Sequence, residues 1–223
     1  SGGERQRTAI GRALLSGPQI LVMDEPLAAL DEARKTEIMP WLERLRDEIR
    51  LPILYVSHSV PEVLRLATTV VLMRQGRVTH AGPLAGILAD PDLAPELGAR
   101  EAGALIRGRV LGRDPDGLRR VATSGGTMLL PGLDLAQGHE LRLRIWSNEV
   151  ILSREAPRGL SALNVLPARV LQIRDGLVQL ALGNERMLAQ VTPRSVKALD
   201  LRPDTTCHAI VKSVSVLPSG GSV

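Results

Sequence analysis

Two consecutive carboxylates, Asp24 and Glu25, end a short apolar segment near the start of the chain. Residues 20–23 lie between a Gly-Pro pair and Pro26, and they are too few for a helix. We predict a strand that is buried on both faces. Because an unpartnered buried carboxylate is costly, the pair is expected at the carboxyl edge of the strand, where parallel sheets hold their ligand sites. For this segment alone, a strand followed by an acidic turn without function stays open.

A second apolar segment, residues 53–56, is followed by Ser57 and His58, which places the histidine at the same predicted sheet edge as Glu25. Phosphoryl transfer to water needs a metal ion, a group that aligns the water, and donors aimed at the developing charge. Asp24, Glu25 and His58 are candidates for these parts. A capping or core histidine is the alternative for His58, and its position at the strand end favours function.

The first four residues, Ser1, Gly2, Gly3 and Glu4, open a predicted helix that Gly-Pro ends at residues 17–18. Ser1 suits an N-cap, and Glu4 follows three residues later as in a capping box. The N–H groups of such a helix start, flanked by glycines, allow a phosphate to approach closely. Ser-Gly-Gly recurs at residues 124–126 and 219–221 with nothing similar after it, so the tripeptide alone predicts only a flexible turn.

Taken in order, these segments resemble the ATPase subunits of ABC transporters over residues 1 to about 90. The resemblance implies that Ser1, Gly2, Gly3 and Glu4 form the signature motif, which closes on the γ-phosphate of ATP held by the opposite subunit. It assigns Asp24 to Mg²⁺ binding through water, and Glu25 to the base that orients the attacking water. It also implies that Asp31 belongs to the D-loop and that His58 is the switch histidine that contacts the γ-phosphate. Four motifs in the right order are far more specific than any one of them.

One motif of that family does not occur in the 223 residues, namely the phosphate-cradling Gly-x-x-x-x-Gly-Lys-Ser/Thr loop. The family places this loop upstream of the signature motif, so we expect the sequence to be a fragment that starts inside the ATPase domain. Without the loop, we expect the fragment to hydrolyse ATP poorly or not at all. Restoring the upstream segment is expected to rescue turnover.

Composition limits the possible classes of protein. With 44% apolar residues, the 223-residue chain can bury more than one core, and its single cysteine excludes an internal disulfide and suits a reducing compartment. We expect no leader peptide, and because the 223 residues contain no apolar run near eighteen residues, we expect no segment of them to cross a bilayer. Residues 98–223 carry 17 basic and 11 acidic side chains, which suits an anionic ligand, although a solvated basic face is commoner. Two Trp, one Tyr and no Phe leave little surface for stacking nucleic acid bases.

The predicted elements divide the chain into three parts. Helices at 32–50, 61–67 and 83–88 alternate with strands at 53–56 and 69–73, and a return strand at 78–81 completes a hairpin. From about residue 104, short apolar stretches at 104–110, 127–130, 140–146 and 150–152 alternate with turn residues, which predicts a β barrel or sandwich. Residues 154–159 suggest a linker, before strands at 168–173, 177–182, 187–191 and 208–217 and one helical turn at 195–199.

A second resemblance, over residues 161 to about 217, is to the molybdate-binding Mop module of the TOBE domain family. In that family, hydroxyls, backbone amides and a lysine hold a tetrahedral oxyanion where paired modules meet. The matching positions are Ser161, Thr192, Ser195, Lys212 and Ser213, whereas Leu163 stands where free-standing binding modules carry an arginine. A divalent oxyanion favours several neutral donors and one cation. The alternative is that these residues cap a turn or are solvated.

The expected fold is therefore an α/β P-loop NTPase-type partial domain followed by an all-β OB-like (TOBE/Mop) domain. We place the ATPase portion at residues 1–97, a β-rich accessory segment with its linker at 98–159, and the TOBE/Mop-like domain at 160–223.

The combination resembles the nucleotide-binding subunit of a molybdate importer. The resemblance implies ATP and Mg²⁺ as cofactors, a homodimer that sandwiches ATP head to tail, and a peripheral position on the cytoplasmic face of the membrane. It also implies integral-membrane permease subunits and, indirectly, an external molybdate-binding protein as partners, with molybdate or tungstate as a possible regulatory ligand and no nucleic acid. Importers of sulfate, iron, polyamines or sugars stay open, as does a non-catalytic module that binds an oxyanion or dimerises.

Overall fold

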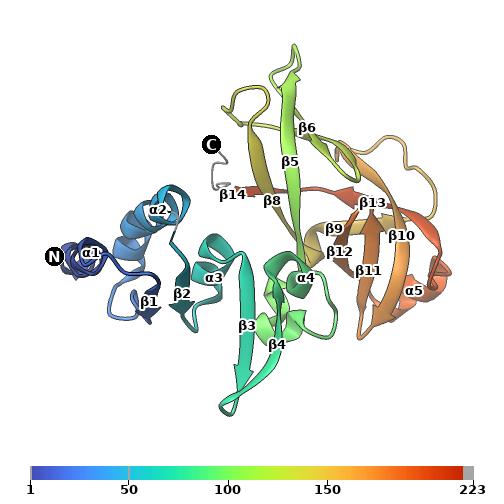
Figure 1. Cartoon of the computed structure of the whole chain (residues 1–223). Helices are drawn as coiled ribbons and strands as arrows, with labels where there is room; N and C mark the ends of the chain where they lie inside the picture. Colours follow the sequence, from blue (N-terminus) through green and yellow to red (C-terminus); the bar gives the residue numbers. More distant parts are fainter. Residues whose placement is uncertain (1, 50, 218–223) are drawn as a thin grey trace. The chain divides into compact units, whose positions relative to one another are not determined.

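The computed structural model describes residues 2–49 and 51–217, and it divides the chain into two compact units that meet in sequence at Val70 and Val71 (Figure 1). The first unit contains helices and a small parallel sheet, and the second contains most of the β structure. This order agrees with the expected fold, a partial α/β domain followed by an all-β domain.

The first unit has five regular elements: α1 (Gly2–Leu15), β1 (Leu21–Asp24), α2 (Glu32–Glu48), β2 (Ile53–Val56) and α3 (Val60–Leu66). Strands β1 and β2 pair in parallel, with Leu21 opposite Ile53 and Asp24 opposite Val56. Side chains from α1, β1 and α2 form the core, because apolar residues recur at helical spacing on the two helices and alternate along the strand. The predicted elements of this region are confirmed to within two residues, and α2 continues through Pro40.

The prediction that the first strand is buried on both faces is wrong. Leu21 and Met23 are buried, but the side chain of Val22 is 57% exposed, and Leu54 on β2 is 50% exposed. In the part of the chain that the structure describes, β1 and β2 form a sheet of only two strands. One face packs on the core, and the apolar residues that alternate with the core residues lie on the other face.

A hairpin that begins at Thr69, just before the boundary between the two units, is followed by a few short helices. Strands β3 (Thr69–Arg74) and β4 (Arg77–Pro83) form the hairpin predicted from sequence, with Gln75 and Gly76 at positive φ in its turn. They are followed by α4 (Leu84–Leu88) and two 3-10 turns, η1 (Ala94–Leu97) and η2 (Ala99–Glu101).

Two five-stranded sheets make up the rest of the second unit. The first contains β5 (Gly103–Arg113), β6 (Arg119–Thr123), β7 (Gly126–Leu130), β8 (Glu140–Trp146) and β14 (Ser215–Leu217). The second contains β9 (Val150–Ser153), β10 (Asn164–Arg174), β11 (Leu177–Leu182), β12 (Glu185–Gln190) and β13 (Thr206–Val211). The turn η3 (Ser147–Glu149) precedes β9, and α5 (Pro193–Ala198) lies between β12 and β13.

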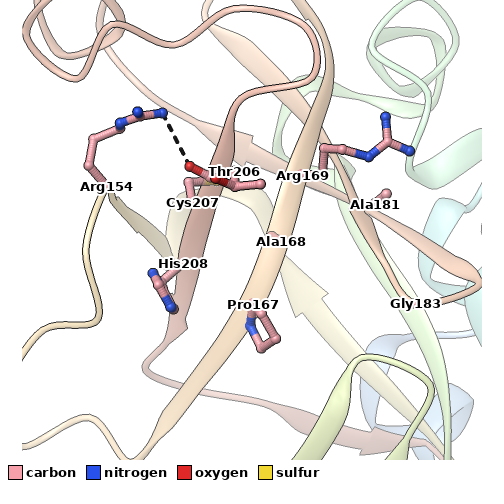
Figure 2. Close-up of a pocket in the computed structure, with 9 residues that line it drawn as sticks. All are labelled: Arg154, Pro167, Ala168, Arg169, Ala181, Gly183, Thr206, Cys207 and His208. Atoms are coloured by element: carbon pink, nitrogen blue, oxygen red, sulfur yellow. Dashed lines mark hydrogen bonds between the residues drawn. The ribbon is translucent and has the colours of Figure 1, made fainter.

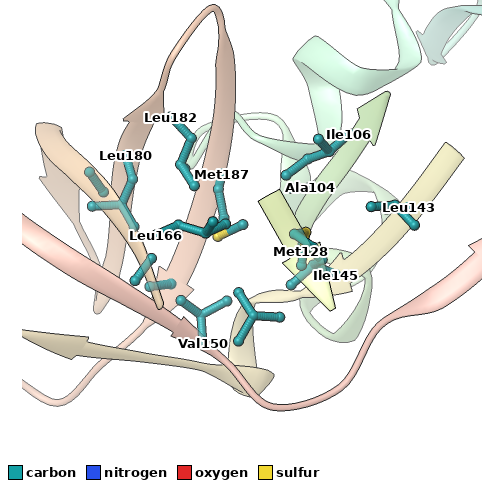
Figure 3. Packing of buried hydrophobic residues seen from close by; sticks show 14 of the residues in the cluster. Ala104, Ile106, Met128, Leu143, Ile145, Val150, Leu166, Leu180, Leu182 and Met187 are labelled. Atoms are coloured by element: carbon teal, nitrogen blue, oxygen red, sulfur yellow. The ribbon is translucent and has the colours of Figure 1, made fainter. Parts of the chain in front are cut away.

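The two sheets are structural repeats of one another, and each sheet contains one strand from the other half of the sequence. Their strand orders, β7-β6-β5-β8-β14 and β12-β11-β10-β13-β9, correspond strand by strand, and the long strands β5 and β10 both bulge, after Val110 and Val170. The last strand of each half lies in the sheet of the other half, where β9 pairs with β13 and β14 pairs with β8. One hydrophobic core contains side chains from both sheets, including the equivalent residues Met128 and Met187, which are fully buried (Figure 3).

The single strand predicted for residues 208–217 is wrong. This segment is divided between β13 and β14, which belong to different sheets, with Lys212, Ser213 and Val214 between them. Strand β6 was not predicted, since its Arg-Arg start breaks the apolar pattern on which the prediction depended.

Candidate functional site

The carboxyl ends of β1 and β2 bring Glu25 and His58 into contact. The Nδ1 atom of His58 lies 2.6 Å from Oε1 of Glu25, and the backbone N–H of His58 donates to the same oxygen over 3.0 Å. The histidine side chain is 81% exposed and that of Glu25 is 34% exposed. Because Nδ1 faces a carboxylate, it carries the proton, and Nε2 points away from Glu25 as an acceptor, or as a second donor when the ring is charged.

The backbone at Glu25 is held in an unusual conformation. Its φ angle is 45°, in the left-handed region that costs a residue with a Cβ about 1 kcal/mol or more. The Glu25 N–H donates to the carbonyl oxygen of Val56 over 2.9 Å, so the parallel pairing of β1 and β2 extends through this residue. The sheet thus fixes the backbone from which the Glu25 side chain turns towards His58.

Asp24 is the last residue of β1 and is exposed at the same edge. Among the residues that the structure describes, no group of three His, Cys, Asp or Glu side chains is placed to hold a metal ion by itself. One carboxylate nevertheless fits Mg²⁺, which commonly takes one or two carboxylates and completes its shell with water and substrate phosphates. Asp24 is therefore suited to a magnesium ion that arrives with a phosphorylated substrate.

The other residues predicted for nucleotide binding lie in two places. Gly2, Gly3 and Glu4 form the first turn of α1, where backbone N–H groups have no partner within the helix, and Ser1 lies outside the described residues. Asp31 is the N-cap of α2, since its Oδ1 accepts from the backbone N–H of Arg34 over 2.9 Å. The geometry thus gives Asp31 a capping role that the sequence analysis had not assigned to it.

A buried carboxylate behind His58 was missed by sequence reasoning. Glu62 on α3 is 5% exposed, and it accepts hydrogen bonds from the Tyr55 hydroxyl at 2.7 Å and the Ser57 hydroxyl at 3.0 Å. Lys35 of α2 lies 3.4 Å from its other oxygen. Burial alone would raise the pKa of Glu62, but these hydrogen bonds lower that pKa below its ordinary value.

The Glu62 cluster supports the loop that carries His58. Ser57 accepts the backbone N–H of Ser59 over 3.0 Å, so its hydroxyl joins both ends of the loop to Glu62. The histidine between them is in turn bonded to Glu25. Two carboxylates, those of Glu25 and Glu62, therefore hold residues 57–59. The signal in the sequence was a glutamate one turn into the helix after Ser-His-Ser, which by itself also suits an exposed helix start.

The residues predicted to bind an oxyanion fall into separate groups in the second unit. Thr192 is the N-cap of α5, and its Oγ1 accepts from the backbone N–H of Ser195 and lies 2.9 Å from the Ser195 hydroxyl. At the other place, the Ser213 hydroxyl bonds to a carboxylate oxygen of Glu149 over 2.7 Å. The backbone N–H of Lys212 donates to the carbonyl oxygen of Glu149 over 3.4 Å.

The remaining position of this set, Ser161, and the nearby Leu163 lie on the surface. Ser161 is exposed between β9 and β10, and the side chain of Leu163 is 56% exposed. Glu149, which the sequence analysis did not consider, brings a negative charge to the hydroxyl that would serve an anion. The described hydrogen bonds thus join Thr192 with Ser195, and Ser213 with Glu149.

Comparison with known proteins identifies the relatives of this chain. Residues 1–28 match the family model of the ABC transporter, and residues 160–218 match that of the TOBE domain. The molybdenum import ATP-binding protein ModC of Rhizobium johnstonii is 50% identical over 222 residues, which cover 97% of this chain and 62% of the relative. The protein of the same name from Mesorhizobium japonicum is 45% identical over 96% of this chain and 60% of its own length.

The chain is homologous to these ATP-binding proteins. It spans about three fifths of the length of the relatives. Both resemblances noted in the sequence, to ABC transporter ATPases and to TOBE domains, are thereby confirmed. A solved structure of the cytoplasmic molybdate-binding protein ModG, with molybdate bound, is 25% identical and matches 51% of this chain and 95% of its own, with a TM-score of 0.44.

None of the helices within residues 2–49 and 51–217 has the length and apolar character needed to cross a bilayer.

Proposed function

We propose that this chain belongs to the ATP-hydrolysing subunit of an ABC importer that takes up molybdate or tungstate. The observation that carries the proposal is the contact of Glu25 with His58 at the carboxyl edge of two parallel strands. The homology to molybdenum import ATP-binding proteins supports the choice of cargo over sulfate, iron, polyamines or sugars.

In this proposal the residues at the sheet edge divide the work of hydrolysis. The Glu25 carboxylate aligns the attacking water and accepts its proton, while its bond to His58 fixes the tautomer of the ring. The Nε2 atom of His58, on the far side of the ring from Glu25, contacts the terminal phosphate. When bound with ATP, Mg²⁺ would neutralise phosphate charge, and Asp24 is the residue that would hold it.

A second copy of the chain completes the proposed site. The first turn of α1, with Gly2, Gly3 and Glu4, offers backbone N–H groups to the nucleotide held by the partner copy, and Ser1 would precede them. Asp31 lies at the start of α2 in the same unit. The homodimer, the permease subunits and the external binding protein are the partners, and the peripheral position at the cytoplasmic face follows from them.

The test uses a hybrid in which the segment with the phosphate-binding loop from the Rhizobium johnstonii relative precedes residues 1–223. We expect the hybrid to hydrolyse ATP. The substitution Glu25→Gln should lower its turnover rate about 100-fold or more, because general base catalysis contributes a rate enhancement of that size. Glu37→Gln, an exposed glutamate on α2, is the matched control. A hybrid whose turnover is the same with Glu25→Gln would refute the proposed role of the carboxylate.

An oxyanion-sensing role for the second unit is a further candidate. It is favoured by the TOBE match at residues 160–218 and by the basic excess of residues 98–223. The described hydrogen bonds join Thr192 with Ser195, and Lys212 and Ser213 with Glu149, and in this proposal the ligand is held where two copies meet. Calorimetry of the full chain with molybdate, tungstate, sulfate and phosphate tests this role, and equal or absent heat for all four would contradict it.

A further inference from the structure

A hollow of about 360 Å³ lies on the second sheet of the second unit. It opens on the face that does not contact the core, over β10, β11 and β13, and the segment after β9 borders it (Figure 2). The lining residues are Arg154, Pro167, Ala168, Arg169, Ala181, Gly183, Thr206, Cys207 and His208. None of the five residues of the predicted oxyanion set is among them.

The hollow exists because its floor lacks long side chains. Pro167 lies opposite His208, and Ala181 lies opposite Arg169 on the neighbouring strand. Gly183 follows β11 with a φ of 57°, and a Cβ there would come within 2.0 Å of the carbonyl oxygen of Ser124. Since no larger residue fits at Gly183 and the floor residues beside it are small, the surface stays open.

Three nitrogen-bearing side chains border this floor. Arg154 is fixed, because its Nη1 donates to the carbonyl oxygen of Thr206 over 3.2 Å (Figure 2). The Nδ1 atom of His208 is shielded from solvent and has no hydrogen-bond partner among the described residues, an uncommon condition for a polar atom. Arg169 is half exposed and forms an ion pair with Asp204, whose side chain is 81% exposed.

The two arginines stand at opposite ends of the hollow, and His208 lies at the Arg154 end. Figure 2 shows Arg154 and His208 on one side of the pocket and Arg169 with the neighbouring Ala181 on the other, with Pro167 between the two sides. The carboxylate of Asp204 lies at the Arg169 end only. An anion with one acidic group would therefore use one end, whereas an anion with two groups would use both.

We propose that this hollow binds a small organic anion with a phosphate or carboxylate group at each end. One acidic group is held by Arg154 and His208, and the other displaces Asp204 from Arg169. Guanidinium groups pair well with both kinds of acidic group, because their donors match two oxygens at once. The volume is at the lower end of what small-molecule sites occupy, about 300–1,000 Å³, and exceeds what a single tetrahedral ion needs.

The repeat within the second unit supports a basic role for this place on the sheet. The position of Arg169, between Ala181 and Thr206, corresponds to that of Arg109 between Ala122 and Glu140. The pair Pro167 and His208 corresponds to Arg107 and Arg142. Both halves thus carry arginine or histidine side chains at matching outward positions. In the second half, these side chains border the hollow.

Titration calorimetry with the full chain tests the site. The probes are inorganic phosphate, pyrophosphate, citrate and fructose 1,6-bisphosphate. We expect at least one of the two-ended organic anions, citrate or the bisphosphate, to bind about tenfold or more tightly than inorganic phosphate. Arg154→Gln and Arg169→Gln are each expected to weaken that binding about tenfold, since each removes a charge-assisted hydrogen bond.

Two further variants separate this site from general charge effects. Arg202→Gln is the matched control, because Arg202 is also exposed and paired with an aspartate, Asp200, and it should leave affinity unchanged. Ala181→Leu keeps every charge and fills the floor, so it should abolish binding while the near-ultraviolet circular dichroism stays unchanged.

Several results would overturn the inference. Equal affinity for inorganic phosphate and the two-ended anions would refute a ligand with two acidic groups. Absence of heat with all four probes would refute the binding site itself. Binding lost in Lys212→Ala but kept in Arg154→Gln would place the anion at the predicted oxyanion residues instead. None of these outcomes depends on ATP hydrolysis, so the proposed transport function stands or falls separately.

Discussion

Replacing Glu62 by glutamine tests the reasoning about the loop of His58. The substitution keeps the shape of the side chain and removes the charge that accepts from Tyr55 and Ser57. Hydrogen bonds to a charged group contribute about 1.5–3 kcal/mol each, and neutral ones about half of that, so the two weakened bonds predict a loss of about 2 kcal/mol in the free energy of unfolding. The loss should appear in the first unit.

The effect should depend on pH in a defined direction. The pKa of Glu62 is lowered in the folded chain, so its ionisation stabilises the fold above the ordinary value of 4.5. This contribution disappears as the pH falls below 4.5 and through the lowered pKa of the folded state. The difference between the native chain and Glu62→Gln should therefore be full at pH 7 and smaller at pH 4.

Urea unfolding followed by the fluorescence of Trp41 is the assay. Trp41 lies on α2 and packs against the core of the first unit, and a Trp146→Phe background removes the other tryptophan. Glu37→Gln, an exposed glutamate on the same helix, is the control and should change the free energy by less than about 0.5 kcal/mol. A change below that value for Glu62→Gln at pH 7, or an equal change at pH 4 and pH 7, would refute the assignment.

Three other outcomes follow from buried polar groups. Arg144 is 1% exposed, and its guanidinium donates to the carbonyl oxygens of Ala104 and Glu101. The substitution Arg144→Lys should lower the stability of the chain by about 2–4 kcal/mol, measured by thermal unfolding, because a lysine ammonium cannot reproduce the forked donor geometry of the guanidinium. Burial raises the pKa of Glu185, although the backbone N–H of Arg107 donates to its carboxylate, so the free energy of unfolding should fall as the pH rises above 4.5. In Glu185→Gln this decrease in stability with pH should disappear. An unchanged dependence of stability on pH would contradict this. Arg65→Lys should cost about 1 kcal/mol, since one of two bonds to Glu43, at 2.7 and 2.9 Å, is lost, and hydrogen exchange of α3 would detect it.

The parts of the fold that the sequence predicted are those with local causes. Glycine and proline flank β1, the acidic pair stands at its carboxyl end, and apolar spacing marks α2, so Glu25 and His58 could be placed at one edge without coordinates. The exposed face of β1 could not be predicted, because an apolar run indicates affinity for a core but not which elements cover it.

The features that the sequence did not predict depend on contacts between distant segments. Glu62 becomes a buried acceptor only when β2, α2 and α3 bring Tyr55, Ser57 and Lys35 around it. The exchange of β9 and β14 is also invisible in a pattern of alternating residues, since such a pattern gives the face of a strand but not its neighbour. The hollow near Arg154 depends in the same way on which strands lie beside Pro167.

The exchange of β9 and β14 has a thermodynamic consequence for any ligand of the second unit. Because the half that ends at β9 supplies an edge of the sheet that bears Arg169 and His208, neither half can lose its structure and leave the other complete. Binding energy gained on one sheet is therefore distributed over both, and an anion bound over β10 should slow amide exchange in β5 and β8 as well. We therefore expect the two halves to unfold in one cooperative transition, with ligand bound on one sheet also stabilising the other.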